Sequence, residues 1–446
     1  MIENYGILSL LPTALVLVIA IVTKKTIAPL VVGVVVSFLM LDGIWFASGF
    51  VNAAYATFQG DTLGMIVLVT ILFGILVQLL DKSQAAQAFS AAVNKHVTSA
   101  KSSLFASWAM GILLFIDDFL NAIVVGTTMR RTTDRYGVPR EMLAYVVDVT
   151  AAPMAVLLPF SAWAIFFMSM FGELGLTAQT GLSEFDMYWH VVPFIFYSII
   201  AILIVPLVIV GIIPPLGQMR DACEKASLKP IDRTAAVPEI GGAKPRHFII
   251  PVLVLVIITF ATEGDVVQGA IIATIAAAGL FLHRGFLTKR QLADSVHEGI
   301  VSMLPVIGIV FFALVLVEGN ARMGTTEFVV ETMAPIMSPE LLPCVTFLIV
   351  SILAFGTGSF FGTAAVVMPI IVPLALGSGC DIFLVLGATI SGAVFGSNCC
   401  FFGDATVLTA SSCQITPIRH ALTQLPYGLI AWALAMSLYA LFGFVL

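Results

Sequence analysis

The chain has 446 residues, of which 60% are hydrophobic and 10% are charged, and its net charge is −6. Soluble proteins carry about 25% charged residues, so this composition and a mean hydropathy of +1.07 exclude a water-soluble globular protein. Apolar runs long enough for a helix to cross a bilayer recur from end to end. We therefore expect an all-α polytopic membrane protein whose partner is the lipid bilayer and which does not bind nucleic acid.

Ten apolar runs predict membrane-spanning helices. They lie near residues 6–23, 27–47, 62–80, 141–170, 188–213, 248–262, 266–283, 299–318, 382–410 and 424–446. Two more apolar runs, 102–129 and 341–376, are interrupted midway by an Asp-Asp pair and by a Gly-rich segment. The polar segment 214–247 separates two sets of runs, which predicts an N-terminal part, 1–213, a linker, and a C-terminal part, 248–446.

The two parts have the same order of features. A shift of about 241 residues carries the run starts near 6, 62, 102 and 141 close to those near 248, 299, 341 and 382. Lys24 and Lys25 follow the first run, whereas Glu263 and Asp265 follow its counterpart. Because Lys and Arg gather on the cytoplasmic side of a membrane, this reversal predicts two inverted repeats, a signature of secondary transporters.

The same charge rule predicts the topology. The basic segments 81–101 and 130–140 flank 102–129 and must both be cytoplasmic, so 102–129 is predicted to be a re-entrant hairpin with its tip at 117–121. Its counterpart, 341–376, is predicted to enter from the outside, with its tip at 356–363.

Each repeat then has five spans plus one hairpin. The linker 214–247 is cytoplasmic, and both termini are extracytoplasmic. Nineteen of the 20 Lys and Arg residues lie inside, with only Arg322 outside. We expect a multi-pass protein of the cell inner membrane or plasma membrane.

Ionisable residues within apolar runs are costly to bury and are usually functional. Four carboxylates meet this criterion: Asp117 and Asp118 at the first tip, Asp148 in 141–170, and Asp404 in 382–410. Proline and clustered glycine in 141–170 and 382–410 predict broken helices. Such breaks are tolerated at membrane depth where protein or a cavity satisfies the backbone hydrogen-bonding groups. The two tips and the two broken helices are expected to converge near the midplane of the bilayer.

Oxygen-bearing side chains around these carboxylates suit a hard cation such as sodium. The predicted binding residues are Asp117, Asp118, Asn121, Asp148, Thr150, Thr357, Ser359, Thr363, Thr389, Ser397, Asn398 and Asp404. The predicted sodium ligands among them are Asp118, Asp148 and Asn398. A buried carboxylate binds either a proton or a metal ion, so sodium and the proton are the expected coupling ions. We predict no enzyme and no other cofactor.

Several of these residues have simpler alternative roles. Asp117 is also placed to cap the second arm of its hairpin, and Asp404 to lie at the cytoplasmic mouth. Arg130 and Arg131 are expected to anchor the hairpin base at lipid headgroups. The six Cys are expected to be small core residues with free thiols, and the six His to lie at the membrane interface, since they fall at or near the ends of segments.

Two stretches resemble the NhaC-type sodium/proton antiporter family of the ion transporter superfamily. They are Phe115-Ile-Asp-Asp-Phe-Leu-Asn121, continuing to Arg130, and Asp148-Val-Thr-Ala-Ala-Pro153. Gly356-Thr-Gly358, Ser391-Gly-Ala-Val-Phe-Gly396 and Thr423-Gln-Leu-Pro-Tyr427 are similar to it as well. The resemblance implies a homodimer whose protomers each have a scaffold domain and a mobile transport domain, with transport by an elevator-like shift of the latter.

The chain departs from that family after Gly396. Related sequences continue with an acidic residue, whereas this chain reads Ser397-Asn398-Cys399-Cys400, so one expected cation ligand is neutral. The leading hypothesis is sodium/proton antiport at a midplane aspartate. The alternative is sodium- or proton-coupled transport or exchange of a small organic solute, such as an amino acid or a carboxylate. An intramembrane aspartyl protease and a passive channel are two further classes.

Overall fold

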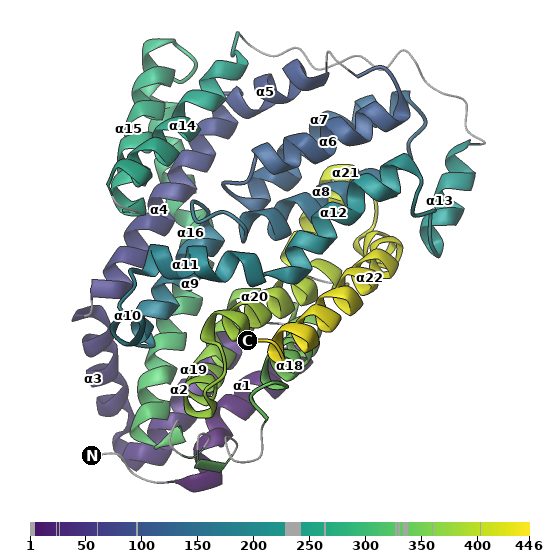
Figure 1. Ribbon diagram of the computed structural model, residues 1–446. Helices are drawn as coiled ribbons and strands as arrows, with labels where there is room; N and C mark the ends of the chain where they lie inside the picture. The colour runs from purple at the N-terminus through teal and green to yellow at the C-terminus, as the bar shows by residue number, and fades with distance from the viewer. Residues whose placement is uncertain are drawn as a thin grey trace.

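The computed structural model of the protein is a bundle of helices, and its described residues contain no strand (Figure 1). The structure describes residues 5–446 except 24, 26, 60, 95–96, 228–241, 263–264, 326–327, 329–330, 333–337, 359 and 402. The fold class is therefore all-helical, as the composition predicts.

The N-terminal part contains twelve α-helices and three short 3-10 helices within its described residues. In chain order they are η1 (Gly6–Leu10), α1 (Leu11–Thr23), α2 (Ile27–Asp42), η2 (Gly43–Trp45), α3 (Phe46–Gln59), α4 (Asp61–Lys82), α5 (Ala85–Asn94), α6 (Ala100–Leu113), α7 (Asp118–Arg135), α8 (Arg140–Ala155), α9 (Ala162–Glu173), α10 (Leu176–Thr180), α11 (Glu184–Val191), η3 (Val192–Phe194) and α12 (Phe196–Val210).

Within its described residues, the predicted linker region contains one short polar helix, and the C-terminal part follows it. In chain order these helices are α13 (Gln218–Ser227), α14 (Pro245–Ala261), α15 (Val266–His283), α16 (Lys289–Arg322), α18 (Leu342–Thr357), α19 (Phe360–Ser378), α20 (Ile382–Cys399), α21 (Asp404–Cys413) and α22 (Pro417–Gly443).

Six helices of the described chain are long and apolar enough to cross a membrane, and two bent helix pairs raise the number to eight. One of these pairs is 184–194 with 196–210, bent by 53°. Four shorter apolar helices, among them 162–173 and 342–357, accompany them. The protein is therefore a multi-pass membrane protein.

Side-chain caps fix where several helices begin. Asp117 caps α7, Ser161 caps α9, Thr288 caps α16 and Asp381 caps α20. Each accepts a hydrogen bond from a backbone N–H three residues further along, which satisfies a donor that the first helical turn leaves free. In an apolar chain these polar residues mark the helix starts that periodicity alone does not locate.

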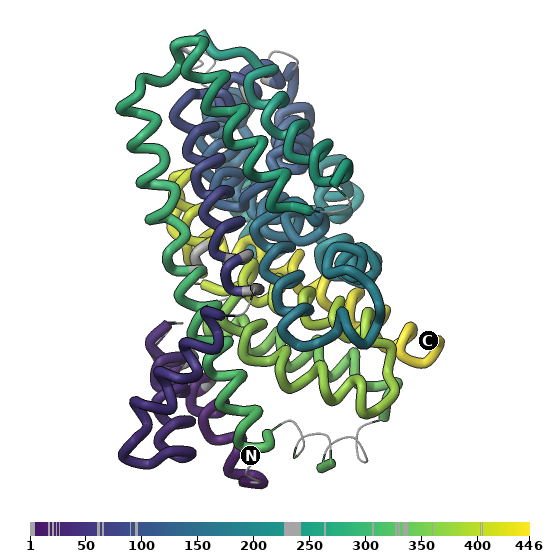
Figure 2. The backbone as a smooth tube through the Cα atoms, turned by 90° about the vertical axis from the view of Figure 1, so that its left-hand side faces the viewer, coloured from purple at the N-terminus to yellow at the C-terminus, as the bar shows by residue number. Residues whose placement is uncertain are grey.

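Two groups of helices are visible side by side in Figures 1 and 2. The first contains α4 packed on α15 and α16, with α14 against α15 and α2 against α16. The second contains α6, α7 and α8 packed on one another, together with α12, α18 and α20–α22. Helix α9 contacts α4 of the first group and α8 of the second, and it also contacts α19, which packs on α16 and on α20, so it lies where the two groups meet.

A break between helices lies within each of the four predicted hairpin or broken-helix runs, 102–129, 141–170, 341–376 and 382–410. Residues 114–117 separate α6 from α7, and Gly358, with φ +67°, ends α18. Residues 156–161 separate α8 from α9, and 400–403 separate α20 from α21. The run 382–410 is broken as predicted, but not at its clustered glycines, because α20 runs through Gly392 and Gly396. They instead let α20 approach the backbone of α18.

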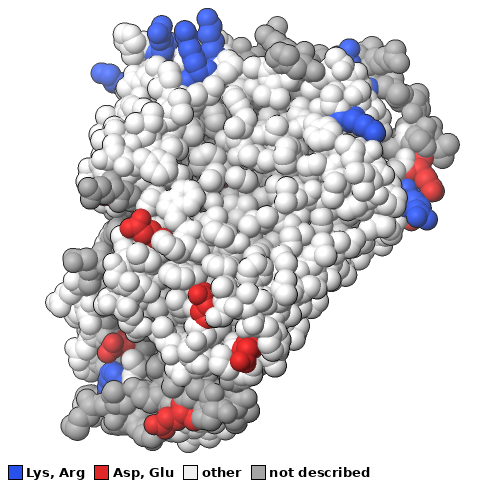
Figure 3. Space-filling model, in the orientation of Figure 1, with Lys and Arg blue, Asp and Glu red and all other residues white. Residues whose placement is uncertain are grey.

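Charge is distributed unevenly over the molecule. In the view of Figure 3, Lys and Arg gather toward the upper end, and Asp and Glu predominate toward the lower end. Arg246 lies at the start of α14, Arg284 directly after α15 and Lys289 at the start of α16. Arg322, at the far end of α16, forms an ion pair with Asp42 at 3.0 Å.

Candidate functional site

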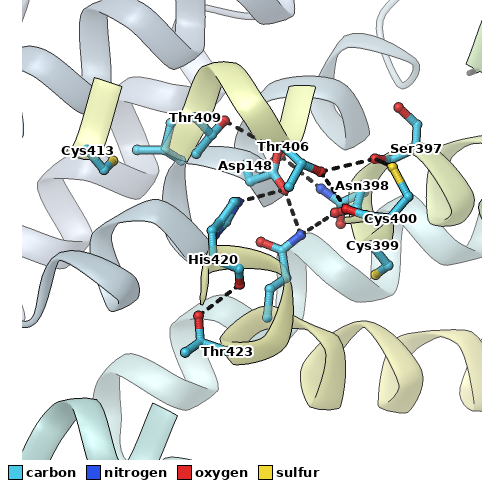
Figure 4. Close-up of polar contacts among 12 residues, drawn as sticks. Asp148, Ser397, Asn398, Cys399, Cys400, Thr406, Thr409, Cys413, His420 and Thr423 are labelled. Atoms are coloured by element: carbon cyan, nitrogen blue, oxygen red, sulfur yellow. Dashed lines mark hydrogen bonds and ion pairs between the residues drawn. The ribbon is translucent and has the colours of Figure 1, made fainter. Parts of the chain in front are cut away.

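Asp148 is the most deeply enclosed carboxylate of the described chain. It lies near the middle of α8, and none of its surface is exposed. Its Oδ2 accepts hydrogen bonds from Gln424 Nε2 at 2.6 Å and pairs with His420 Nε2 at 3.2 Å. Its Oδ1 accepts one from Thr409 Oγ1 at 3.4 Å. Figure 4 shows the side chains of α21 and α22 converging on this carboxylate.

The residues around Asp148 come from four helices. His420 and Gln424 lie one turn apart on α22, so both reach the same carboxylate oxygen of α8. Asn398, near the end of α20, donates from Nδ2 to the backbone carbonyl of Asp148 at 3.3 Å and accepts from Tyr197 Oη of α12 at 3.0 Å. The network therefore joins parts of the chain about 250 residues apart.

The Asp148 carboxylate has no basic partner other than an imidazole among the described residues. Lys and Arg form their ion pairs elsewhere: Arg419 with Glu141, and Arg140 with Asp134 at 2.9 Å. A buried charge without a partner is unfavourable by several kcal/mol, so such a group is normally neutralised by a proton or a bound cation.

The first predicted tip holds two more buried carboxylates. Asp117 accepts a hydrogen bond from Leu120 N at 2.8 Å and caps α7, which confirms the capping role considered for it. Asp118 is 5% exposed, and its Oδ1 accepts from the indole Nε1 of Trp163 at 3.0 Å. Like Asp148, both lack a Lys or Arg partner within the described part of the chain.

Trp163 connects the two predicted tips. Its ring lies 3.7 Å, centroid to centroid, from Phe360, the first residue of α19, and 5.3 Å from Phe361. Since the same indole donates to Asp118, one side chain of α9 contacts the start of α7 and the start of α19. Residues 118 and 360 therefore lie in one neighbourhood of the fold, although 241 residues separate them in the sequence.

Asn121 fastens the first tip to its neighbours. Its Nδ2 donates to the carbonyl of Gly111 at 2.6 Å and to that of Thr150 at 2.8 Å, so it joins α7 to α6 and α8. The Thr150 hydroxyl donates to Val146 O of its own helix at 2.8 Å. Thr150 therefore contributes its backbone carbonyl, and its hydroxyl is engaged locally.

The remaining predicted residues are distributed over α18–α21. Thr357 and Thr363 hydrogen-bond each other at 3.0 Å across the Gly358 turn. Thr389 donates to Val385 O of its own helix at 2.9 Å, and the Ser397 carbonyl accepts from Thr406 at 3.4 Å. Asp404 is the first residue of α21, and its side chain lies outside the described set.

Ser359 also lies outside the described residues. The two helices that flank it end at Thr357 and begin at Phe360. The backbone carbonyl of Gly358 lies close to Gly403, since a Cβ added at Gly403 would be 3.3 Å from it. This contact places the second tip beside the start of α21.

Three polar atoms in this region are buried without a hydrogen-bond partner among the described residues. They are Asn121 Oδ1, Gln424 Oε1 and His420 Nδ1. A buried acceptor left unsatisfied costs about 1–3 kcal/mol, so it calls for a donor or a cation that the protein itself does not supply. All three belong to side chains with no exposed surface.

Sequence reasoning missed His420, Gln424 and Trp163. His420 was expected at the membrane interface because it lies near the start of a span, and this expectation is wrong: the side chain is fully buried against Asp148. The position of a residue along an apolar run does not indicate how far its side chain is buried in the protein when that end of the helix packs against another helix, here α8. The spacing of four residues between 420 and 424 places two polar side chains on one helical face, and this signal could have found His420 and Gln424.

The arginines at the edge of the site contact the broken helix α21. Arg130 of α7 donates to the carbonyl of Ser412 at 2.5 Å, and Arg140 donates to Gln414 Oε1 at 3.1 Å. Cationic groups at the C-terminal end of a helix are favourable because they complement its dipole. Arg130 therefore binds protein, whereas the sequence suggested an anchor to lipid.

The described structure is thus a multi-pass helical membrane protein with a buried acidic centre that has no Lys or Arg partner among the described residues. Two solved transporter structures are similar in fold. One is the YdaH transporter of Alcanivorax borkumensis, with a TM-score of 0.68 over 90% of this chain and 88% of that one. The other is MtrF of Neisseria gonorrhoeae, presented as one of a class of antimetabolite efflux pumps. Its TM-score is 0.63 over 92% of this chain and 86% of that one. Both are 14% identical in sequence, so they show the fold alone.

The chain belongs to the Na+/H+ antiporter family, whose model matches residues 154–444. An uncharacterized protein of Haemophilus influenzae is 28% identical over 98% of this chain and 91% of its own length. The malate-2H+/Na+-lactate antiporter of Bacillus subtilis is 26% identical over 44% of this chain and 42% of that protein. The matched region contains the helices from α9 to α22, and it begins after the Asp117–Asp118 and Asp148 motifs.

Proposed function

We propose that the chain is a sodium/proton antiporter in which the two ions compete for buried carboxylates. The observation that carries this proposal is the environment of Asp148: a fully buried carboxylate whose described ion-pair partner is an imidazole. Such a group is neutralised either by a proton or by a monovalent cation, and binding one expels the other. Family membership agrees with this chemistry.

We assign the cation to oxygen ligands around Asp148 and the first tip. Asp148 and Asp118 supply charge, and the Oδ1 of Asn398 supplies a neutral oxygen from α20. Asn121, whose Oδ1 is buried without a described partner, belongs to the same set. Oxygen donors of this kind suit sodium better than a soft metal.

The proposal extends to the architecture around the site. Helices α6, α7 and α8 recur in order as α18, α19 and α20, which favours two inverted repeats with re-entrant hairpins at 102–129 and 341–376. Basic residues concentrated at one end of the molecule favour a cytoplasmic linker and extracytoplasmic termini in the plasma membrane. A homodimer with an elevator-like motion of the second helix group completes the proposal.

One observation favours a second candidate function, exchange of a small organic carboxylate. The wall beside Asp118 is aromatic, built from Trp163, Phe360 and Phe361, and rings of this kind contact a carbon skeleton. The Bacillus relative carries malate and lactate in its name, so both are suitable probes. Counterflow of labelled malate or lactate without sodium/proton exchange would select this candidate over the first.

The test of the main proposal is proton movement in proteoliposomes driven by a sodium gradient. Wild-type protein is expected to alkalinise or acidify the lumen, according to the direction of the gradient, with no organic solute present. Asp148→Asn keeps the shape of the side chain but removes its charge, and we expect it to abolish the exchange. Sodium-independent pH signals, or full activity of Asp148→Asn, would contradict the proposal.

A further inference from the structure

We infer that Gln424 is a cation ligand: its side-chain carbonyl oxygen binds the monovalent cation that pairs with Asp148. This inference rests on the proposed function and adds to it a residue from α22. The side chain has no exposed surface, and its Oε1 has no hydrogen-bond partner among the described residues.

The orientation of the Gln424 amide follows from its neighbours. One end of the amide lies 2.6 Å from Asp148 Oδ2 and 2.7 Å from the carbonyl oxygen of Asn398. Both neighbours are acceptors, so the atom that faces them must be Nε2, which has two hydrogens to donate. A flipped amide would direct Oε1 at a carboxylate and a carbonyl. The network therefore fixes Oε1 as the free end.

The chemistry of the free end identifies its ligand. An amide carbonyl is a hard oxygen donor, the kind that sodium and lithium prefer and that soft metals do not. A water molecule would also satisfy Oε1, but it would bring no positive charge to Asp148, whose described ion-pair partner is the His420 imidazole. A monovalent cation satisfies the carbonyl and balances the carboxylate together.

Gln424 also positions the carboxylate. Its Nε2 joins Asp148 of α8 to Asn398 of α20, two of the residues to which we assign the cation. Asn121 has the same pattern at the first tip, with both amide hydrogens donated and Oδ1 free. The two amides thus present unpaired carbonyl oxygens beside the two groups of buried carboxylates.

The experiment measures sodium dependence in reconstituted Gln424→Asn and Gln424→Met proteins. Asn retains the amide but withdraws its carbonyl by one methylene, and Met fills the space without an oxygen. We expect the KM for sodium to rise at least fivefold in Gln424→Asn and more in Gln424→Met, and the preference for sodium over lithium to change. Thr423→Val is the matched control, because the adjacent buried Thr423 hydroxyl bonds only its own helix, at Arg419 O and His420 O.

Thermal unfolding in sodium chloride against choline chloride gives a readout that does not require transport. Wild type and Thr423→Val are expected to melt at a higher temperature in sodium, since a bound ion stabilises the folded state, and the Gln424 variants to lose that increase. Gln424 variants that keep the wild-type sodium KM, ion preference and sodium-specific melting shift would overturn the inference. If wild type itself lacked sodium-coupled exchange, the proposed function would fail instead.

Discussion

At the residue scale, the bond between Trp163 and Asp118 is charge-assisted whenever the carboxyl group is ionised, and it has a counterpart elsewhere in the fold. Trp163 Nε1 donates to a carboxylate oxygen at 3.0 Å, and Trp432 Nε1 donates to the neutral Ser351 hydroxyl at the same distance. Hydrogen bonds to charged groups contribute about 1.5–3 kcal/mol, and neutral ones about 0.5–1.5 kcal/mol. The pair therefore separates the effect of charge from that of losing an indole.

Replacing each tryptophan by phenylalanine tests this difference. Trp163→Phe keeps a ring against Phe360 but removes the indole donor of the buried Asp118, so we expect a loss of about 1.5–3 kcal/mol at a pH where Asp118 is ionised. Trp432→Phe is expected to lose about half as much. Denaturant or thermal unfolding of the two purified variants in the same detergent measures both values, and equal losses would rule out a special contribution from Asp118.

The sequence located Asp117, Asp118 and Asp148 because a carboxylate within an apolar run is conspicuous. It did not locate Gln424 or Trp163, since a glutamine near a span end and a tryptophan in an apolar run are both common. Their partners are far away along the chain, and only packing brings them together. Thr150 and Thr389 illustrate the converse, because a hydroxyl in a helix readily bonds the carbonyl of the preceding turn.

At the scale of elements, helices α4 and α16 cross where two glycines meet. A Cβ placed on Gly299 would lie 2.6 Å from the backbone N and Cα of Ile75, next to Gly74 on α4. No side chain there can move aside to make room, so the two backbones would have to separate.

Gly299→Ala therefore tests the crossing. We expect a loss of about 1–3 kcal/mol, the usual cost of forcing extra atoms into a packed interface. Gly279, within α15, has nothing within 4 Å of an added Cβ, so Gly279→Ala is expected to gain about 0.5–1 kcal/mol from helix propensity. Melting temperatures of the two variants should shift in opposite directions; a stable Gly299→Ala protein would mean that the helices do not approach this closely.

The sequence predicted most helices of the bundle, since the apolar runs and the helix bounds agree to within a few residues for runs such as 62–80 and 266–283. It could not separate α2 from α3, and it could not predict the exact positions of the breaks in 141–170 and 382–410. Glycine has two opposite uses, breaking a helix and letting helices approach, and a sequence does not tell them apart. Gly392 and Gly396 have the second use.

At the scale of the whole molecule, the proposed topology places α13 in the cytoplasm. This helix lies outside the spans and carries Cys223, which is a free, half-buried thiol. Burial, together with the nearby acidic Glu141 and Glu224, raises the pKa of the Cys223 thiol above its ordinary value. Because the thiolate is the reactive form, Cys223 should react slowly near neutral pH and faster as the pH rises.

A membrane-impermeant maleimide tests both statements. We expect labelling of Cys223 in inside-out vesicles and little in right-side-out vesicles, with a rate that increases from pH 7 to pH 9. Cys223→Ser identifies which label belongs to this thiol, since the other five cysteines remain. Labelling from the outer face would reverse the proposed orientation of the entire chain.

The indole of Trp163 has a consequence for motion. The indole donates to Asp118 at the first tip and packs on Phe360 at the second. A displacement of either loop alone would therefore break the hydrogen bond to Asp118 or the ring contact with Phe360. Under the proposed elevator-like motion, we therefore expect the two loops to move together as one unit. A spin label or fluorophore on each loop should report a constant separation through the whole transport cycle, even while both change their distance to α4.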